Sequence, residues 1–390
     1  MMSISSGFYR QFAMERVLHG SPFDTLLAAE LEAGGHEKVL LLTAPQAVGT
    51  PDLARLETAI GNRLAGTFSG LAPHTPLEGV LKAADLARKL GADHLVALGG
   101  GSVIDAAKLI ALCVHEGIDA PEGLLNKYPT AGVDPSRRPS SAGGWIRMTA
   151  LPMTLSAAEF TWFAGVTDTA KGLKYVVGHP MMMAQTVIMD PALTLGMGAT
   201  DFLASGIRAV DHAAERLAAL TSHPFNDAVC RQALQMLSAY LPRIHKDPRD
   251  LEARQQSQMA GWLSQAGAGT GVRVGASHAL GHVLGAHAGI PHGLTSCLLL
   301  PAVMTWNAGV NAERQALVSA ALGADDIPAA EAIRRLVAAI ELPTRLRDVG
   351  IIRDDLALIA AKSFHDPGLR NNPRPVETTA DVQEILELAW

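Results

Sequence analysis

A run of glycines that directly follows a short apolar segment constrains this chain more than any other feature. Gly99-Gly100-Gly101-Ser102 comes after Leu95–Leu98 (LVAL), and Val103–Val114 continues with apolar residues at helical spacing. A short apolar run next to turn residues is typical of a buried parallel strand. Glycines let a backbone approach a pyrophosphate closely, and the N–H groups at the start of a helix attract its charge. We therefore expect a strand, a phosphate-binding turn and a helix.

Two charged residues on the predicted helix extend this candidate cofactor site. Asp105 and Lys108 follow the glycines, and Lys108 lies far enough along the helix for its ammonium to reach a phosphate or a ribose. The spacing of the glycines is not that of the G-x-G-x-x-G dinucleotide fingerprint. A tight turn that uses glycine only for packing is therefore the alternative interpretation.

A second strand and a helix complete this unit. Val39–Leu42 (VLLL) predicts another buried strand. Thr75, Pro76 and Glu78 predict the start of a helix, with Thr75 as the N-cap and Pro76 as the first helical residue, and apolar residues then recur at helical spacing from Leu77 to Leu90. Strand, helix and strand in this order predict a doubly wound parallel sheet. The first strand ends at Thr43 with no carboxylate after it. We assign Thr43 to the cofactor site and expect weak discrimination between NAD and NADP.

The sequence pattern changes near residue 190. Val187–Met189 predicts a last strand, and from about Thr200 onward apolar residues recur at helical spacing. A chain of 390 residues also exceeds the usual size of a single hydrophobic core. We therefore expect an α/β domain with a doubly wound parallel sheet over residues 1–190, followed by an all-α domain over residues 191–390.

Two local patterns give further expectations. Thr378 and Asp381 predict a capping box at the start of a C-terminal helix with one apolar face. Pro129–Gly144 is rich in proline, serine, glycine and alanine, which predicts an exposed loop.

Composition excludes several classes of protein. The chain is 48% hydrophobic and 18% charged, which argues against global disorder, and its net charge of −6 argues against nucleic-acid binding. Three widely spaced cysteines, Cys113, Cys230 and Cys297, predict neither a disulfide framework nor a zinc knuckle. We find no apolar run long enough for a membrane span and no leader pattern in the first residues. A cytoplasmic protein with no membrane or nucleic-acid partner is expected.

Histidines are concentrated in the second half of the chain. His278 and His282 are four residues apart on a predicted helix, His292 follows in Pro291-His292-Gly293, and His212 lies on an earlier helix. Imidazoles at this spacing share one helix face and serve as metal ligands or as acid and base. The alternative is a set of helix histidines that bind backbone carbonyl groups or solvent.

These segments together resemble the iron-containing (group III) alcohol dehydrogenase family over almost the whole chain. The resemblance rests on the motifs GGGSVIDAAK, LPMTLSAAEFT, DPALT, GIRAVDHAAE, HALGHVLGAHAGIPHG and NPRPVETTADVQEILELAW. Within the family, Thr43–Gln46 (TAPQ) is most similar to maleylacetate reductases. The resemblance implies a dehydroquinate synthase-like fold, with the active site in the cleft between a nicotinamide-binding domain and a helical domain, and it implies a homodimer.

The resemblance also implies roles for individual residues. Gly99, Gly100, Gly101 and Ser102 would hold the pyrophosphate, and Thr154 and Lys174 would lie along the cofactor. Three of the family's four ligands to iron or zinc would be His212, His278 and His292. His282 matches a histidine that lies near the reacting carbon without binding the metal.

Two positions depart from the family pattern. Arg208 stands where the family has its aspartate ligand, and Ala157-Ala158 replaces the usual Gly-Ser before Glu159. A guanidinium stays charged and cannot coordinate a metal, and one helical turn from His212 it would repel a cation. Three histidines alone can still bind zinc. We favour a site without metal.

The expected reaction is hydride transfer from NADH or NADPH to an oxo acid or an unsaturated oxo acid. Arg208 would bind the substrate carboxylate or the developing oxyanion, and His282 or His278 would be the general acid. A structural ion pair of Arg208 with Asp211 or Glu215 is the alternative for that residue. Three alternatives stay open for the protein: a metal-dependent alcohol dehydrogenase for an uncharged alcohol and aldehyde, a lyase or cyclase resembling dehydroquinate synthases, and a cofactor-binding protein without turnover.

Overall fold

The computed structural model describes residues 9, 13–125, 143–171 and 173–390, without the side chains of residues 286, 287 and 292. Most of the predicted loop at Pro129–Gly144 lies outside the described residues. The chain divides into two compact units, Gln11–Gly196 and a second unit built on Met197–Trp390. The first unit ends close to the boundary expected after residue 190.

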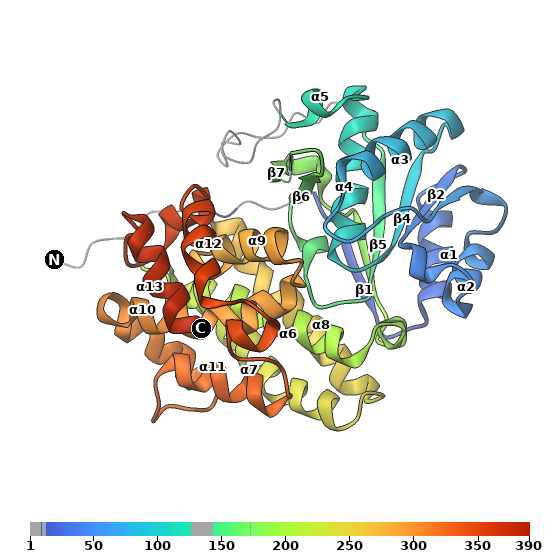
Figure 1. Ribbon diagram of the computed structural model, residues 1–390. Coiled ribbons are helices and arrows are strands. Elements are labelled where there is room, and N and C mark those ends of the chain that lie inside the picture. Colours follow the sequence, from blue (N-terminus) through green and yellow to red (C-terminus); the bar gives the residue numbers. More distant parts are fainter. Residues whose placement is uncertain (1–8, 10–12, 126–142, 172) are drawn as a thin grey trace. The chain divides into compact units, whose positions relative to one another are not determined.

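A parallel sheet of six strands forms the centre of the first unit (Figure 1). Its strand order is β1-β8-β5-β4-β2-β3, and every pair is parallel. The strands are β1 (Arg16–His19), β2 (Val39–Thr43), β3 (Leu64–Phe68), β4 (His94–Gly99), β5 (Arg147–Pro152) and β8 (Thr186–Met189). The strands predicted at Val39–Leu42, Leu95–Leu98 and Val187–Met189 are all confirmed.

Helices cover both faces of this sheet, as a doubly wound fold requires. Helices α1 (Phe23–Ala33) and α2 (Pro51–Ile60) pack on one face through alternate strand residues such as Leu41 and Val96. Helix α4 (Gly101–Glu116) contacts β4 and β5 and packs against α3 (Leu77–Leu90). Figure 1 shows α3 and α4 across the sheet from α1 and α2. The short α5 (Pro121–Leu125) follows α4.

The start of α3 differs from the prediction. The helix begins at Leu77, its N-cap is Pro76, and no side chain caps it. Thr75 has a φ of 53°, and its hydroxyl donates to the carbonyl oxygen of Ser102 at 3.1 Å. The predicted N-cap at Thr75 is therefore wrong, because that hydroxyl binds another segment of the chain.

An antiparallel hairpin, which the sequence did not predict, adds to the first unit. Strands β6 (Phe163–Asp168) and β7 (Leu173–Gly178) pair in register from Phe163 with Gly178 to Asp168 with Leu173. Lys174, one of the predicted cofactor residues, lies on β7.

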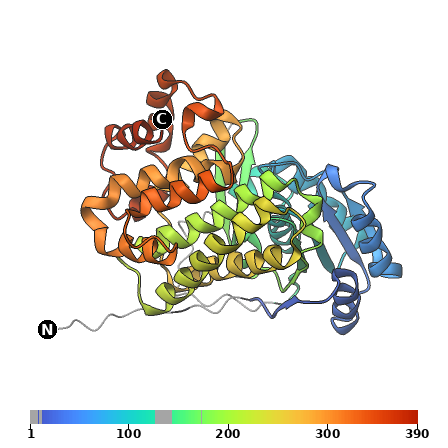
Figure 2. The same cartoon turned by 90° about the horizontal axis from the view of Figure 1, so that it is seen from below.

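The second unit is helical, and Figure 2 shows its helices packed alongside one another. Its helices are α6 (Ala199–Ala218), α7 (Pro224–Lys246), α8 (Leu251–Ala266), α9 (Ala276–Ala288), α10 (His292–Ala321), α11 (Ala329–Ala339), α12 (Leu356–Ser363) and α13 (Thr379–Ala389). The predicted capping box is confirmed, because Thr378 and Asp381 bind each other's backbone N–H groups at the start of α13. The predicted change from α/β to all-α is therefore also confirmed.

One helix of this unit is long and apolar. Among the described residues, Gly293–Ala321 is the segment that matches a membrane span by length and composition alone. However, 67% of its most apolar window is buried inside the protein. Such burial is typical of a core helix. The three cysteines are free and buried.

Candidate cofactor and catalytic site

The glycine turn lies between β4 and α4, where the sequence placed it. Gly100 is the N-cap of α4 and Gly101 its first residue. A Cβ atom built on Gly99 would lie 2.6 Å from Cγ2 of Val103, and one on Gly100 would lie 3.0 Å from Cγ2 of Thr154. Any side chain at Gly99 would thus collide with α4. The packing role that the sequence left open is present, and the position before a long helix also suits a phosphate.

Ser102, beside the turn, is bound to a strained loop. Its hydroxyl accepts a hydrogen bond from the backbone N–H of His74 at 3.0 Å, and its carbonyl oxygen accepts the hydroxyl of Thr75. His74 and Thr75 have φ values of 64° and 53°, which are unfavourable for residues with a Cβ. Thr167 binds the same loop from β6, through hydrogen bonds to both carbonyl oxygens. This loop therefore lies directly against the predicted pyrophosphate site, which the sequence did not reveal.

Lys108 is fully buried, and its ammonium has protein partners. Nζ donates to oxygen atoms of Ala158, Phe163, Thr161 and Asp105, at 2.5, 2.8, 2.9 and 3.1 Å. These acceptors outnumber the three N–H groups of a lysine. The Lys108 ammonium therefore joins α4 to the segment after β5, which is a structural role. The geometry gives no support to a contact between Lys108 and a phosphate.

The other charged groups near Lys108 complete this buried network. Asp105 binds Lys108 with one carboxylate oxygen and accepts the backbone N–H of Gly165 with the other, at 2.9 Å. Burial raises the pKa of Glu159 to about 7, against the opposing effect of Lys108. Burial also lowers the pKa of Lys108, while Asp105 and Glu159 act in the other direction. Asp105 thus connects α4 to the β6–β7 hairpin.

The remaining predicted cofactor residues lie in the same unit. The hydroxyl of Thr43 donates to the carbonyl oxygen of Leu98 at 3.0 Å and thereby joins β2 to β4. Thr154 lies against Gly100, and its hydroxyl donates to Ser156 at 3.2 Å. Lys174 lies close to Gly165, because a Cβ atom there would be 2.9 Å from Cε of the lysine. The structure therefore brings Thr154 to the glycine turn and Lys174 to the strand that Asp105 binds.

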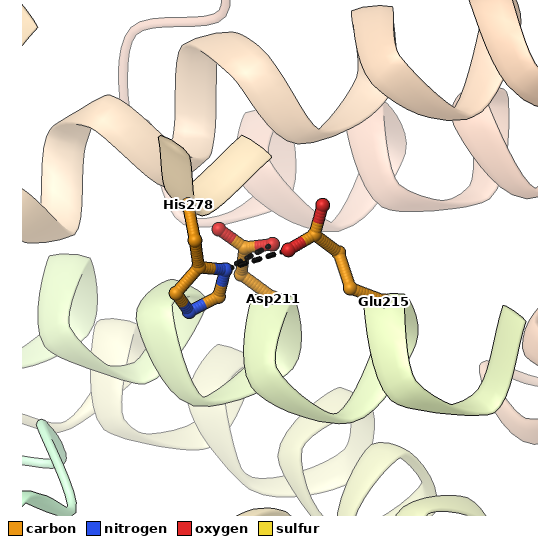
Figure 3. Close-up of side chains that lie close together, drawn as sticks. All are labelled: Asp211, Glu215 and His278. Carbon is orange, nitrogen blue, oxygen red and sulfur yellow. Dashed lines mark hydrogen bonds and ion pairs between the residues drawn. The ribbon is translucent and has the colours of Figure 1, made fainter. Parts of the chain in front are cut away.

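The candidate catalytic residues lie in the second unit, on α6 and α9. Arg208, Asp211 and Glu215 recur at intervals of three and four residues along α6, so they share one face of that helix. His278, near the start of α9, points its ring toward Asp211 and Glu215 (Figure 3). Its Nδ1 lies 2.7 Å from an oxygen of Glu215 and 3.5 Å from an oxygen of Asp211. All three side chains are buried.

Arg208 is held by a charged and a polar partner. Its Nη1 lies 3.7 Å from the carboxylate of Asp211 and donates to the hydroxyl of Ser296 at 3.2 Å. Asp211 also accepts the hydroxyls of Ser277 and Ser296, at 2.8 and 2.7 Å. Burial opposes the low pKa of the Asp211 carboxyl, but His278 and Arg208 keep it below its usual value. The ion pair that the sequence gave as an alternative for Arg208 is therefore present.

His212 and His278 lie ring to ring, with centroids 4.8 Å apart. Burial lowers the pKa of His212 well below its usual value, and the neighbouring His278, Arg208 and Arg216 lower it further. Nδ1 of His212 and Nε2 of His278 are buried with no hydrogen-bond partner among the described residues.

His282 is more accessible than His278. Its side chain is 28% exposed, against 6% for that of His278. The Nδ1 atom lies 3.0 Å from a carboxylate oxygen of Asp366, a residue that the sequence reasoning missed. His292 is the first residue of α10, and its side chain lies outside the described part of the structure.

Among the described side chains, which do not include that of His292, two features oppose the divalent metal that the resemblance implies. The donor atoms of Asp211, Glu215 and His278 lie within 4.8 Å of one another, but the two carboxylates already accept hydrogen bonds from backbone N–H groups, hydroxyls and the imidazole. Arg208 pairs with Asp211 and lowers the proton affinity of His212. The same positive charge opposes a divalent cation more strongly than it opposes a proton. The centre is a hydrogen-bonded ion network.

Comparisons with known proteins identify the family of the chain. Residues 16–191 match the family model for iron-containing alcohol dehydrogenase, and residues 202–390 match the model for the C-terminal part of the Fe-containing alcohol dehydrogenase family. Maleylacetate reductases from Burkholderia cepacia and Delftia acidovorans are 29% and 31% identical to the chain; the matches cover 99% and 96% of this chain and 98% and 95% of theirs.

A structural comparison gives the same result. The crystal structure of maleylacetate reductase from Agrobacterium tumefaciens is similar with a TM-score of 0.82, at 27% sequence identity and with 99% of both chains covered. A probable alcohol dehydrogenase from Escherichia coli is 33% identical over 77% of this chain and 73% of its own. The chain is an oxidoreductase that belongs to the iron-containing alcohol dehydrogenase family, in the branch that resembles maleylacetate reductases.

Proposed function

We propose that this enzyme reduces an oxo acid or an unsaturated oxo acid with NADH or NADPH, without a catalytic metal. The observation that carries the proposal is the state of Arg208. Its Nη1 contacts Asp211 and Ser296, whereas the described residues make no hydrogen bond to its Nε or Nη2, and its side chain is 12% exposed. Those two nitrogens form one edge of the guanidinium, which matches a carboxylate through two parallel hydrogen bonds.

Asp211 supports this role for Arg208. A buried arginine without a counter-ion would be costly, and Asp211 supplies the opposite charge from the same helix. Because Asp211 holds only Nη1, the guanidinium is fixed in orientation while its other edge stays available. The names of the maleylacetate reductases among the relatives also support a carboxylated substrate.

The proposed chemistry needs one hydride and one proton. A nicotinamide held at the glycine turn would supply the hydride, and negative charge would then develop on an oxygen or a conjugated atom of the substrate. Arg208 stabilises that charge or the carboxylate beside it. His282 is the proposed general acid, because its side chain is partly exposed while that of His278 is buried.

The proposed cofactor site is the glycine turn and its surroundings. The pyrophosphate would be held by Gly99, Gly100, Gly101 and Ser102. The rest of the cofactor would lie along Thr43, Thr154 and Lys174. The buried network of Asp105 and Lys108 would stabilise this part of the unit without a contact to the cofactor. We also expect a cytoplasmic homodimer, and this stays a prediction.

A metal-dependent alcohol dehydrogenase is the second candidate. It is favoured by the unpartnered ring nitrogens of His212 and His278, which are atoms of the kind that bind zinc or iron. The charge of Arg208 beside them is the argument against it.

A substrate panel tests the proposed function. We expect oxidation of NADH or NADPH with oxo acids at a kcat/KM roughly 10²-fold or more above that of uncharged aldehydes of the same size, because the aldehydes leave the Arg208 edge unpaired. The measurement is the loss of the absorbance of reduced nicotinamide at a fixed, neutral pH. Equal or higher kcat/KM for the aldehydes would support the second candidate.

A further inference from the structure

We infer that Asp366 is a positioning residue for His282: it fixes the protonated Nδ1 so that proton transfer takes place at Nε2. The inference rests on the proposed function of His282 as general acid. Asp366 lies 84 residues after His282 in the sequence, and nothing else in the chain predicted that the two would meet.

The carboxylate of Asp366 is fixed at both of its oxygens. One oxygen lies 3.0 Å from Nδ1 of His282, and the other accepts the backbone N–H of Gly368 at 2.8 Å. The second bond makes Asp366 the N-cap of the short helix η10 (Pro367–Asn371). Because each oxygen has its own partner, the carboxylate cannot rotate without the loss of a hydrogen bond.

The segment that carries Asp366 is itself packed on α9. A Cβ atom on Gly368 would lie 3.2 Å from Cβ of Ala279, so the two backbones approach closely at this point. Leu369 is buried in the same apolar cluster as Ala279 and Leu280. The position of Asp366 relative to His282 is therefore set by a packed core and by the cap, and not by the His282 contact alone.

This geometry determines which ring nitrogen can transfer a proton. A carboxylate at Nδ1 favours a proton there in both the neutral and the charged imidazole. The charged form gives its Nε2 proton to the substrate that the hydride would reduce, and the neutral form keeps Nδ1–H bonded to Asp366. A proton taken up from bulk solvent then restores the charged form at Nε2, so that one hydride and one proton are consumed in each turnover.

His278 has a similar carboxylate contact, to Glu215, but a different exposure. Its Nε2 is buried, whereas the His282 side chain is 28% exposed. Of these two histidines, His282 therefore combines a fixed Nδ1 with access to a reactant.

The substitution Asp366→Asn tests this inference because the two ends of an amide differ. The Asn oxygen would accept the Gly368 N–H, as the carboxylate oxygen does in the wild-type enzyme, so the NH₂ group would face Nδ1 of His282. Because an NH₂ group donates a hydrogen bond, it disfavours a proton on Nδ1. We expect kcat to fall by about 10²-fold with little change in KM. Asp366→Ser, which keeps a capping oxygen but does not reach His282, should give a similar fall. Asp250→Asn is the control, because Asp250 is also an N-cap with an ionic partner but has no histidine contact.

A double-mutant cycle with His282→Gln separates positioning from a structural role. If Asp366 acts through His282, Asp366→Asn should lower kcat no further in the His282→Gln background. An equal fall in both backgrounds, or an equal fall in Asp250→Asn, would overturn the inference. The cycle can use whichever carbonyl compound the enzyme reduces, so failure of the oxo-acid proposal does not affect it.

Nuclear magnetic resonance of imidazole nitrogens gives a readout that needs no turnover. In the wild-type enzyme the His282 signals, assigned by their loss in His282→Gln, should show protonated Nδ1 in the neutral ring. In Asp366→Asn they should show protonated Nε2. An unchanged tautomer in Asp366→Asn would contradict the inference, whether or not the enzyme reduces a carbonyl compound. A lack of carbonyl reduction would contradict only the proposed function.

Discussion

Replacement of Arg208 by alanine is expected to raise the KM for a carboxylated substrate by about 10²-fold. Two charge-assisted hydrogen bonds to one carboxylate, each worth about 1.5 kcal/mol, correspond to this factor. The KM for an uncharged aldehyde should stay within about threefold of the wild-type value, since that substrate has no group for Arg208 to bind. Steady-state kinetics with one oxo acid and one aldehyde of similar size measure both effects on the same preparations.

Arg208→Lys is the matched variant for this prediction. It keeps a positive charge beside Asp211 but lacks the planar edge of the guanidinium, so the KM for the oxo acid should be intermediate. Loss of Arg208 also leaves Asp211 buried without its arginine partner, which should lower the melting temperature of Arg208→Ala. A lower melting temperature with an unchanged KM for the oxo acid would show that the ion pair is structural and that Arg208 does not bind substrate.

We expect the second large effect, a loss of thermal stability, from the substitution Lys108→Met. The substitution keeps the apolar part of the side chain but leaves the Asp105 carboxylate and three other oxygen acceptors without the ammonium. Removal of one partner from a buried ion pair costs about 3 kcal/mol. For a unit of this size we expect the first thermal transition to fall by about 10 °C, measured by calorimetry or circular dichroism.

Lys89→Met is the control for the lysine substitution. Lys89 forms an ion pair with Asp85 on the exposed side of α3, and its side chain is 71% exposed, so its loss should change the melting temperature little. The same variants distinguish the two roles considered for Lys108. A wild-type melting temperature in Lys108→Met together with weaker NADH binding would favour a direct contact with phosphate over the structural role.

Features that depend on neighbouring residues could be predicted from the sequence. The glycine turn, the buried strands beside it and the capping box at Thr378 each depend on a few consecutive side chains and their backbone preferences. The change to helices near Thr200 is also local, because hydrophobic spacing reports each helix separately.

Features that depend on long-range contacts could not be predicted. Thr75 has the sequence of an N-cap, yet its hydroxyl binds Ser102 because the chain before α3 packs on the start of α4. Lys108 has the spacing of a phosphate ligand, but the segment after β5 surrounds its ammonium with oxygen atoms. Asp366 carries no local signal, since only the packing of η10 on α9 brings it to His282.

The candidate catalytic residues on α6 and α9 lie between these two cases. The sequence placed Arg208 one turn from His212 and identified the conflict with a metal. It also offered the ion pair of Arg208 with Asp211 as an alternative, but it did not show that Glu215 would bind Nδ1 of His278. That contact needs both α6 and α9, whose relative position is set by packing.

The metal content of active enzyme tests the central claim most directly. The account predicts that the purified protein holds no stoichiometric iron or zinc by plasma mass spectrometry, and that dialysis against a chelator leaves kcat for the oxo acid unchanged. A tightly bound metal at about one ion per chain, with activity lost on its removal and restored on its return, would contradict the account.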